Sequence, residues 1–429
     1  MGIQKGIFVV LFLTIFSNLH AQISVDAQLR SRFEYRHGYK TLFPDNTDPA
    51  AFIGQRTRLN IDYKTENLDV LLSFQNISVW GDVPQLNTAD RNGLMIYQAW
   101  AKVYLSESFA IKAGRQEIIY DDSRIFGNVD WATQGRSHDA LQLKWQNEGF
   151  KLDVGLAYNQ TNEQLTGNDY NILGTYKTFQ YMWLHKDWTN FSGSFLFLNN
   201  GLQHIDNTNN QNNEVRYSQT VGIHSNYKKD KLGLSSNLYY QGGKDIINSS
   251  LNAYLLAFSA DYQVSEKSKV VFGAEIISGN DNGAPNNQKN KAFNPLYGTN
   301  HKFNGLMDYF YVGNHYPNVG LTDVYLTNTT KLNAKSSLSV TLHNFSAASD
   351  LAGSSKKRLG NEVDLVFSHA VRKSISLKVG YSQLFASEGM EILKGNSDNN
   401  TNNWVWIMLD ITPNLFKSTK TEKQLLSRN

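Results

Sequence analysis

Three features of the sequence predict an all-β fold: a transmembrane antiparallel β-barrel of about eighteen strands that follows a cleaved signal peptide. Apolar and polar residues alternate along most of the chain, and short polar turns alternate with long loops rich in Asn, Gly and Asp. Aromatic residues make up 12% of the sequence, and no helical period follows the N-terminal segment. A barrel explains these features, because a sheet that crosses lipid must close on itself to pair every backbone group.

The N-terminal segment has the pattern of a signal peptide. Lys5 precedes an apolar run at residues 7–16, which is too short to span a bilayer, and the small residue Ala21 ends the segment. We therefore expect cleavage before Gln22, export, and a final place in the bacterial outer membrane, surrounded by lipid and lipopolysaccharide. The expected segments are a signal peptide at 1–21, an outer-membrane β-barrel at 22–416 and a polar C-terminal tail at 417–429.

The composition argues against several classes of protein. The chain has 41 basic and 38 acidic residues, a near balance that argues against nucleic acid as a partner. It has no cysteine, so neither a disulfide framework nor a thiolate metal site is available. Only seven prolines are present and no Pro/Ser-rich linker interrupts the sequence, which indicates one long unit.

Amphipathic strands are clearest in three stretches. In residues 25–37, 55–64 and 151–159 nearly every second residue is apolar, which is typical of a strand with one face in water. Most strands would contain about 10 to 14 residues, a length that suits tilted strands crossing a membrane. A barrel of this size is wide enough to hold an aqueous lumen.

The connections between strands predict which end of the barrel is which. Outer-membrane barrels have short periplasmic turns and longer extracellular loops. Short turns are expected at 65–67, 106–107, 147–149, 188–190, 228–230, 265–267, 333–335 and 371–373, and longer loops at segments such as 81–93, 200–213, 279–317 and 387–402. A Tyr or Trp stands before most short turns and predicts an aromatic girdle at the membrane interface: Tyr63, Tyr104, Trp145, Trp188, Tyr227 and Tyr262.

Basic residues on the polar faces of the strands are the candidate pore lining. Arginine suits a carboxylate because its planar fork holds both oxygens and keeps its proton, and rings of Arg or Lys select anions in pores. The expected solute-binding residues are Arg30, Arg32, Arg36, Arg56, Arg58, Lys102, Arg115, Arg124, Arg136 and Lys144. Arg115 is out of step with Lys112, so it faces the lumen only if Gly114 forms a bulge. The alternative is a self-neutralising set of charges that only keeps the lumen wet.

The stretch GRQEIIYDDSRIFGNVDWATQGRSHDAL, residues 114–141, is the densest in charge and aromatic residues. If residues 121–136 fold into the lumen, Arg115, Arg124 and Arg136 would line a constriction. Phe126 and Trp131 would then anchor the loop against the wall. The expected orienting carboxylates are those of Asp121, Asp122, Asp130 and Asp139.

The long segment 279–317 divides into two halves of different character. Its polar half, residues 279–291, is expected to be mobile. Its aromatic half, residues 293–316, is too apolar to extend into water, so it is expected to pack over or into the barrel mouth.

Several segments resemble the alginate export family of outer-membrane porins. The resemblance lies in RFEYR (32–36), GQRTRL (54–59), the 114–140 block and LYGTNHKFNGLMDYFY (296–311). It implies a monomeric eighteen-stranded barrel whose arginine-rich constriction passes an anionic uronate polymer. The basic residues that match are Arg32, Arg36, Arg56, Arg58, Arg115, Arg124 and Arg136. The chain departs from the family in two ways: its turn at 371–373 is short, and a polar tail follows Phe416.

These observations predict an anion-selective outer-membrane porin for a uronate-like oligo- or polysaccharide, without a cofactor. A periplasmic partner at the short turns is left open, and a general or plugged barrel that acts as a structural or binding partner is the alternative. A hydrolase is the weakest hypothesis, since no G-x-S-x-G or H-E-x-x-H is present and Ser137, His138 and Asp139 point to alternate faces of a strand. No enzyme is expected, and no metal site, because segments 45–48 and 279–287 lack the spacing of a calcium loop.

Overall fold

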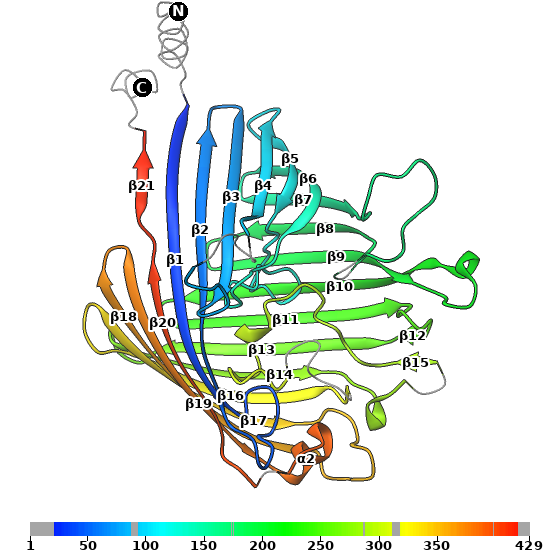
Figure 1. Ribbon diagram of the computed structural model, residues 1–429, viewed down its shortest axis with the longest axis vertical. Helices are drawn as coiled ribbons and strands as arrows, with labels where there is room; N and C mark the ends of the chain where they lie inside the picture. Colours follow the sequence, from blue (N-terminus) through cyan, green and yellow to red (C-terminus); the bar gives the residue numbers. More distant parts are fainter. Residues whose placement is uncertain are drawn as a thin grey trace, which may run out of the picture.

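The computed structural model is a closed antiparallel β-barrel (Figure 1). It describes residues 21–418 except 87–92, 173, 175, 286–287, 311–317 and 398. The expected signal peptide, apart from Ala21, and the tail beyond Ser418 lie outside the described residues. The main sheet has 19 strands, of which β21 continues β20 after a short break, so eighteen strands form the wall, as predicted.

Each wall strand pairs with its neighbours in the chain, and β1 pairs with β20 to close the barrel. The first nine strands are β1 (Gln22–His37), β2 (Ala50–Lys64), β3 (Leu68–Val79), β4 (Met95–Tyr104), β5 (Phe109–Gln116), β6 (His138–Asn147), β7 (Phe150–Tyr158), β8 (Thr178–Asp187) and β9 (Phe191–His204). The others are β10 (Glu214–Lys229), β11 (Leu232–Gly243), β13 (Ala253–Gln263), β14 (Ser268–Ile277), β16 (Leu321–Lys331), β17 (Ser336–Ser346), β18 (Arg358–Arg372), β19 (Ile375–Ala386), β20 (Asn402–Ile411) and β21 (Asn414–Lys417).

Little other regular structure is present in the described ranges. Strands β12 (Ser250–Leu251) and β15 (Lys289–Asn290) form a small parallel pair in the long loops. The helical elements are α2 (Glu388–Lys394), η2 (Asn210–Asn212), η3 (Asp281–Gly283) and η4 (Asn300–Lys302). No helix among the described residues is long and apolar enough to cross a membrane.

The two ends of the barrel differ in the length of their connections. Eight short turns lie at the end where β1 begins and β21 ends, and the long loops lie at the other end (Figure 1). We call these the short-turn end and the long-loop end. By the general rule for such barrels, the short-turn end faces the periplasm.

This orientation can be tested with single cysteines, because the chain has none of its own. Asn207→Cys places a thiol in the exposed loop between β9 and β10, and Thr189→Cys places one in the exposed turn between β8 and β9. An impermeant maleimide should label the Asn207→Cys protein on intact cells and the Thr189→Cys protein only after the outer membrane is permeabilised. The reverse pattern would overturn the orientation.

Alternate residues of each strand face lipid and lumen. Large apolar side chains such as Leu59, Leu256 and Phe272 are exposed on the outer face, while the inner face is polar. The predicted girdle aromatics lie on the outer face with one exception. Tyr104 was placed wrongly, because it shares the inner face with Lys102 and donates a hydrogen bond to Asp69 on β3 at 2.7 Å.

Four inner-face glycines each lie directly opposite an aromatic ring on the next strand. The pairs are Gly155 with Tyr181, Gly222 with Tyr239, Gly273 with Tyr325, and Gly380 with Trp406. A Cβ on any of these glycines would lie 2.1 Å from an atom of the opposite ring. The aromatic ring therefore covers the backbone of the glycine, a device that joins neighbouring strands of twisted sheets.

One such pair gives a stability prediction. Gly155→Ala should push the Tyr181 ring away from Gln142 and Tyr120, with which its hydroxyl forms hydrogen bonds, and overpacking of this kind costs about 1–3 kcal/mol. The temperature at which the folded barrel unfolds in detergent should fall. Gly54→Ala is the matched control, because its Cβ would meet nothing closer than 3.7 Å and should leave that temperature unchanged.

Two of the long loops fold into the barrel and form a core there. Loop 117–137, between β5 and β6, and segment 293–310, between β14 and β16, bury Phe126, Tyr297 and Met307 against the inner wall. The inward packing predicted for 293–316 is confirmed over residues 293–310, and the inward fold that was set as a condition for 121–136 is observed; 311–316 lie outside the described residues. The barrel therefore has an apolar interior at the height of the loops, in addition to its polar wall.

The polar half of the long segment differs from expectation. Asn280 is buried, and its side chain forms hydrogen bonds to Asn290 and to the backbone of Lys291. Strand β15 in this half also pairs with β12. The prediction of a freely moving segment was wrong for these residues, because their amide side chains find partners within the loop itself.

Candidate functional site: the barrel interior

Two arginines of the interior join β1 and β2 to loop 117–137. Arg56 donates to Oδ1 of Asp130 at 2.7 Å, and Arg30 donates to the backbone oxygen of Asp130 at 2.7 Å. Arg30 also lies 3.4 Å from Oδ2 of the same carboxylate. The side chain of Arg30 is 5% exposed and that of Arg56 is 1% exposed, whereas the Asp130 side chain is 54% exposed. We call this arrangement the arginine cradle.

The cradle holds its carboxylate in the ionised form. Burial raises the pKa of Asp130, but the charges of Arg56 and then Arg30 outweigh burial and lower this pKa below its ordinary value. Charge-assisted bonds of this kind are about twice as strong as neutral ones. The arginine cradle is thus a site built to bind a carboxylate, and the loop supplies that carboxylate.

Arg32 anchors the same loop through an aromatic side chain. It donates to the backbone oxygen of Trp131 at 2.6 Å, and its guanidinium lies 4.2 Å from the centre of the Trp131 ring. The ring of Trp131 also packs 4.8 Å from that of Trp406 on β20. Glu34 neutralises Arg32 and Arg36, at 2.9 and 2.8 Å.

Arg58 connects β2 to the start and the end of the loop through its neighbours. It donates to Gln75 on β3 at 2.8 Å and lies 3.7 Å above the ring of Tyr97 on β4. Tyr97 donates to Glu117 at 2.5 Å, and Gln75 donates to the backbone oxygen of Gln134 at 2.9 Å. The four arginines Arg30, Arg32, Arg56 and Arg58 are therefore inward, yet each is occupied by the loop or its neighbours.

Arg124 fastens the loop to the opposite wall. Its guanidinium pairs with Glu275 on β14, both side chains being buried, and lies 3.3 Å from the centre of the Phe303 ring. Asn304 donates to the other oxygen of Glu275 at 2.8 Å. Loop 117–137 and segment 293–310 therefore meet at one buried ion pair.

Arg115 and Arg136 were predicted to line one constriction, but the structure separates them. The ladder from β4 through β5 to β6 runs without a shift at Gly114, so Arg115 lies on the face opposite to Lys112. It pairs with Asp139 at 2.8 Å and its side chain is 43% exposed, so the predicted pore-lining position was wrong. Arg136 remains inside, where it donates to the backbone oxygen of Gly298 at 3.1 Å.

The four aspartates expected to orient arginines divide between two tasks. Asp130 orients arginines of the interior and Asp139 orients Arg115, as described above. Asp121 instead accepts hydrogen bonds from Ser194 and Trp183, and Asp122 accepts one from Asn237, so these two bind the loop to β8, β9 and β11. The expectation that they orient arginine guanidiniums was wrong. Phe126 does pack against the wall, with its ring 4.9 Å from that of Tyr181.

Lysines on β4, β5 and β6 line two adjoining cavities on the short-turn side of loop 117–137. The cavities measure about 280 and 340 Å³ and share Tyr120 and Lys144. Lys144 pairs with Asp153, and Lys102 donates to Tyr104 at 3.0 Å. Lys112 lies 4.0 Å from the centre of the Trp100 ring and forms no ion pair within the described chain. Lys112 was absent from the predicted site, although alternation places it inward.

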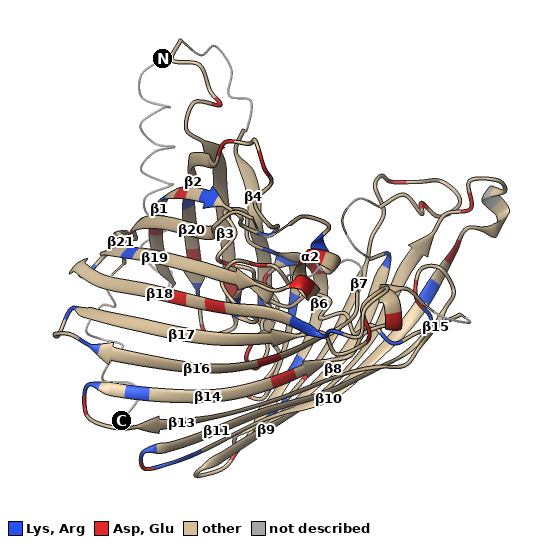
Figure 2. Cartoon of the chain, turned by 90° about the horizontal axis from the view of Figure 1, so that it is seen from below, with Lys and Arg blue, Asp and Glu red and all other residues tan. Residues whose placement is uncertain are grey.

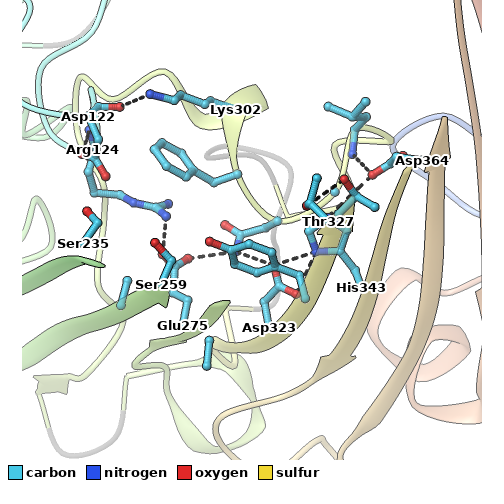
Figure 3. A pocket seen from close by; sticks show the side chains of 18 of the residues that line it. Asp122, Arg124, Ser235, Ser259, Glu275, Lys302, Asp323, Thr327, His343 and Asp364 are labelled. Atoms are coloured by element: carbon cyan, nitrogen blue, oxygen red, sulfur yellow. Dashed lines mark hydrogen bonds and ion pairs between the residues drawn. The ribbon is translucent and has the colours of Figure 1, made fainter. Parts of the chain in front are cut away.

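The opposite wall is acidic and was missed entirely by the sequence analysis. A cavity of about 490 Å³ lies between segment 302–306 and strands β11 to β18 (Figure 3). His343 stands between Asp323, at 2.9 Å, and Asp364, at 3.7 Å. The alternating Glu362 and Asp364 of β18 gave a signal for this wall that charge counting over the whole chain concealed.

The interior can therefore bind anions on one side and hydrogen-bond donors on the other. Basic residues predominate along the inner faces of β1 to β6, and carboxylates predominate on β14 to β18. Across the described ranges, no group of three His, Cys, Asp or Glu residues is arranged to hold a metal ion.

Known proteins resemble this chain in sequence profile and in fold. The profile of the alginate export family matches residues 21–403. No curated protein sequence matches significantly. OpdL of Pseudomonas aeruginosa is similar over 92% of this chain and 99% of its own, with a TM-score of 0.60 and 14% identity. OccAB4 of Acinetobacter baumannii is similar over 93% and 99%, with a TM-score of 0.63 and 12% identity. These similarities in structure concern the fold alone.

Proposed function

This chain belongs to the alginate export family of bacterial outer-membrane barrels, and from that membership we propose that it conducts an acidic saccharide across the outer membrane. The proposed solute is a uronate oligo- or polysaccharide, which carries one carboxylate on each sugar. The observation that carries the proposal is the arginine cradle, where Arg56 holds the carboxylate of Asp130 at 2.7 Å and Arg30 lies 3.4 Å from its other oxygen. A solute carboxylate of the same chemistry can exchange with that of the loop.

Two further features support the proposal. Asp130 is half exposed although its arginines are buried, so the bound carboxylate can be reached from the lumen. The lysine-lined cavities lie next to the loop on its short-turn side, and together with the cradle they give an acidic chain successive positive contacts. Rings of Arg and Lys with water between them are the usual basis of anion selection in pores.

Recordings from single channels in a planar bilayer test this function. We expect anions to permeate better than cations at low salt, with a preference that shrinks as salt screens the charges. An oligouronate should block the current, and a neutral oligosaccharide of equal length should block it far less. Cation selectivity, or equal block by the two saccharides, would overturn the proposal.

A barrel with a plugged lumen that serves as a structural or binding partner is the second candidate. It is favoured by the two internal loops, which fold into the barrel and bury Phe126, Tyr297 and Met307 against the inner wall. The same recordings separate the two functions, because a barrel whose lumen is plugged by its loops would pass no measurable ion current under any salt gradient.

A further inference from the structure

The rim at the short-turn end consists of two halves with unlike charge. The turns after β2, β4 and β6 each contain one glutamate, namely Glu66, Glu107 and Glu148. The turns after β10, β13, β16 and β18, with the strand ends beside them, are instead rich in basic residues. These are Lys228, Lys229, Lys231, Lys267, Lys269, Lys331, Lys335, Arg372, Lys373 and Lys378, all exposed, and we call them the basic rim. Figure 2 shows the positive charge at the ends of β14, β16 and β17.

Part of the basic rim faces the lumen. Lys269 alternates with the buried inner-face residues Gly273 and Glu275 along β14. The register places Lys269 opposite Thr329 of β16, and Lys331 follows two residues later on the same face. The members on the inner face are Lys228 of β10, Lys269 of β14, Lys331 of β16 and Lys378 of β19. Positive side chains therefore line the mouth itself and do not only surround it.

The basic rim differs from Lys144 and Lys151 on the opposite side of this end, which are neutralised by ion pairs. On the opposite side Lys144 pairs with Asp153, and Lys151 pairs with Asp187 at 3.3 Å. Across the part of the chain that the structure describes, no residue of the basic rim forms an ion pair. The four turns of this half and the strand ends beside them contain three acidic residues, Asp230, Asp261 and Glu266, against the ten basic ones.

We propose that the basic rim is the loading surface where an acidic polymer first binds before it enters the lumen from the short-turn end. This inference rests on the proposed function and adds the residues that first bind the polymer. A linear polyanion fits the surface because four inner-face lysines follow one another along the mouth, on β10, β14, β16 and β19. Strands β14 and β16 are neighbours, about 4.8 Å apart, and each of the other two steps spans three strand spacings. Lysine also suits capture and release, since it is a hydrated point charge on a flexible stem and does not grip a carboxylate bidentately as arginine does.

An anionic phospholipid headgroup is the other source of the same charge. Headgroups lie around the outside of a barrel, so a lipid site requires basic residues on the outer face. Lys228, Lys269, Lys331 and Lys378 lie on the inner face, where a solute passes. The geometry thus favours a polymer that enters the mouth.

The test compares two quadruple variants of the full-length protein. The first, K228Q/K269Q/K331Q/K378Q, removes the inner-face charges of the basic rim. The matched control, K289Q/K291Q/K356Q/K357Q, removes four positive charges from the long-loop end, and it should lose no on-rate at the short-turn end. Both are recorded in planar bilayers with an oligouronate added to one side at a time, and a labelled Asn207→Cys fixes the orientation of each channel.

We expect the on-rate of block from the short-turn end to exceed that from the long-loop end in the wild type. The rim variant should lose about tenfold of that on-rate at low salt and nothing at about 1 M salt, since steering by charge is screened. Its on-rate from the long-loop end should not change.

Three outcomes would overturn the loading surface: equal on-rates from both ends in the wild type, the same loss in the control variant, or a loss that depends on anionic lipid in the bilayer. A wild-type channel that oligouronate blocks from neither end would instead overturn the proposed function itself. The two failures are therefore distinguishable.

Discussion

Replacing Arg124 by methionine is expected to detach loop 117–137 from the acidic wall and to increase the conductance of the channel. The guanidinium of Arg124 is buried against Glu275, and removal of one partner leaves the other charge buried without its counter-charge. Such a change typically costs about 3–5 kcal/mol. Loop 117–137 would then be cut by protease in the folded barrel, at sites that the wild type protects.

The double variant R124M/E275Q is the control for this result. It removes both charges, so the penalty of a buried lone carboxylate disappears and protection of the loop should largely return. The coupling between the two substitutions measures the ion pair apart from general damage to the barrel. Equal protease sensitivity of R124M and wild type would show that the pair does not hold the loop.

Asp130→Asn should have the second large effect, on selectivity. It removes the carboxylate that occupies the arginine cradle and keeps the shape of the side chain, so Arg30 and Arg56 lose their counter-charge. A charge-assisted contact is worth about 1.5–3 kcal/mol, so block by oligouronate should tighten by about tenfold or more. The preference for anions over cations should also rise.

Asp139→Asn is the matched control for the cradle. It removes one carboxylate close by in the sequence, but Asp139 pairs with Arg115 on the other face of the wall. It should leave both selectivity and block unchanged. Weaker block in the Asp130→Asn protein would mean that Asp130 itself positions the solute, and the exchange of carboxylates would be wrong.

The pH dependence of the cradle follows from the same contact. Because the arginines lower the pKa of Asp130 below its ordinary value of 3.8, its contribution to loop docking is fully present above that value and is lost as pH falls through the lowered pKa. Selectivity that depends on Asp130 should thus be constant between about pH 5 and pH 7. At the acidic limit the wild type should approach the Asp130→Asn protein.

The strand pattern was readable from the sequence because the period of a strand is local. Alternation and turn composition predicted the number of strands. The same alternation could have excluded Tyr104 from the outer aromatic girdle. Lys102 and Tyr104 are two residues apart, so an inward Lys102 implies an inward Tyr104. Arg115 needed more than local pattern, because only the unbroken ladder beside Gly114 shows that no bulge turns it.

The partners of the basic residues were beyond the reach of the sequence. Arg30 and Asp130 are 100 residues apart, and alternation gives the face of a side chain but not what lies opposite it. The arginines were predicted as a free track, whereas the loop that they face supplies its own carboxylate and backbone oxygens. The acidic wall was not predicted for a related reason: its negative charges balance the positive charges of β1 to β6 in any count over the whole chain.

Loop 117–137 is attached to strands on two sides of the barrel, by Asp130 at β1 and β2 and by Arg124 at β14. A wide cylinder with an empty bore can flatten under the lateral pressure of a membrane, because its hydrogen-bonded wall bends easily between strands. The loop crosses the lumen and is held at both ends by ion pairs, so it resists a change in the distance between the two sides of the wall. The cross-section of this barrel therefore depends on the span of an internal loop as well as on the number of strands.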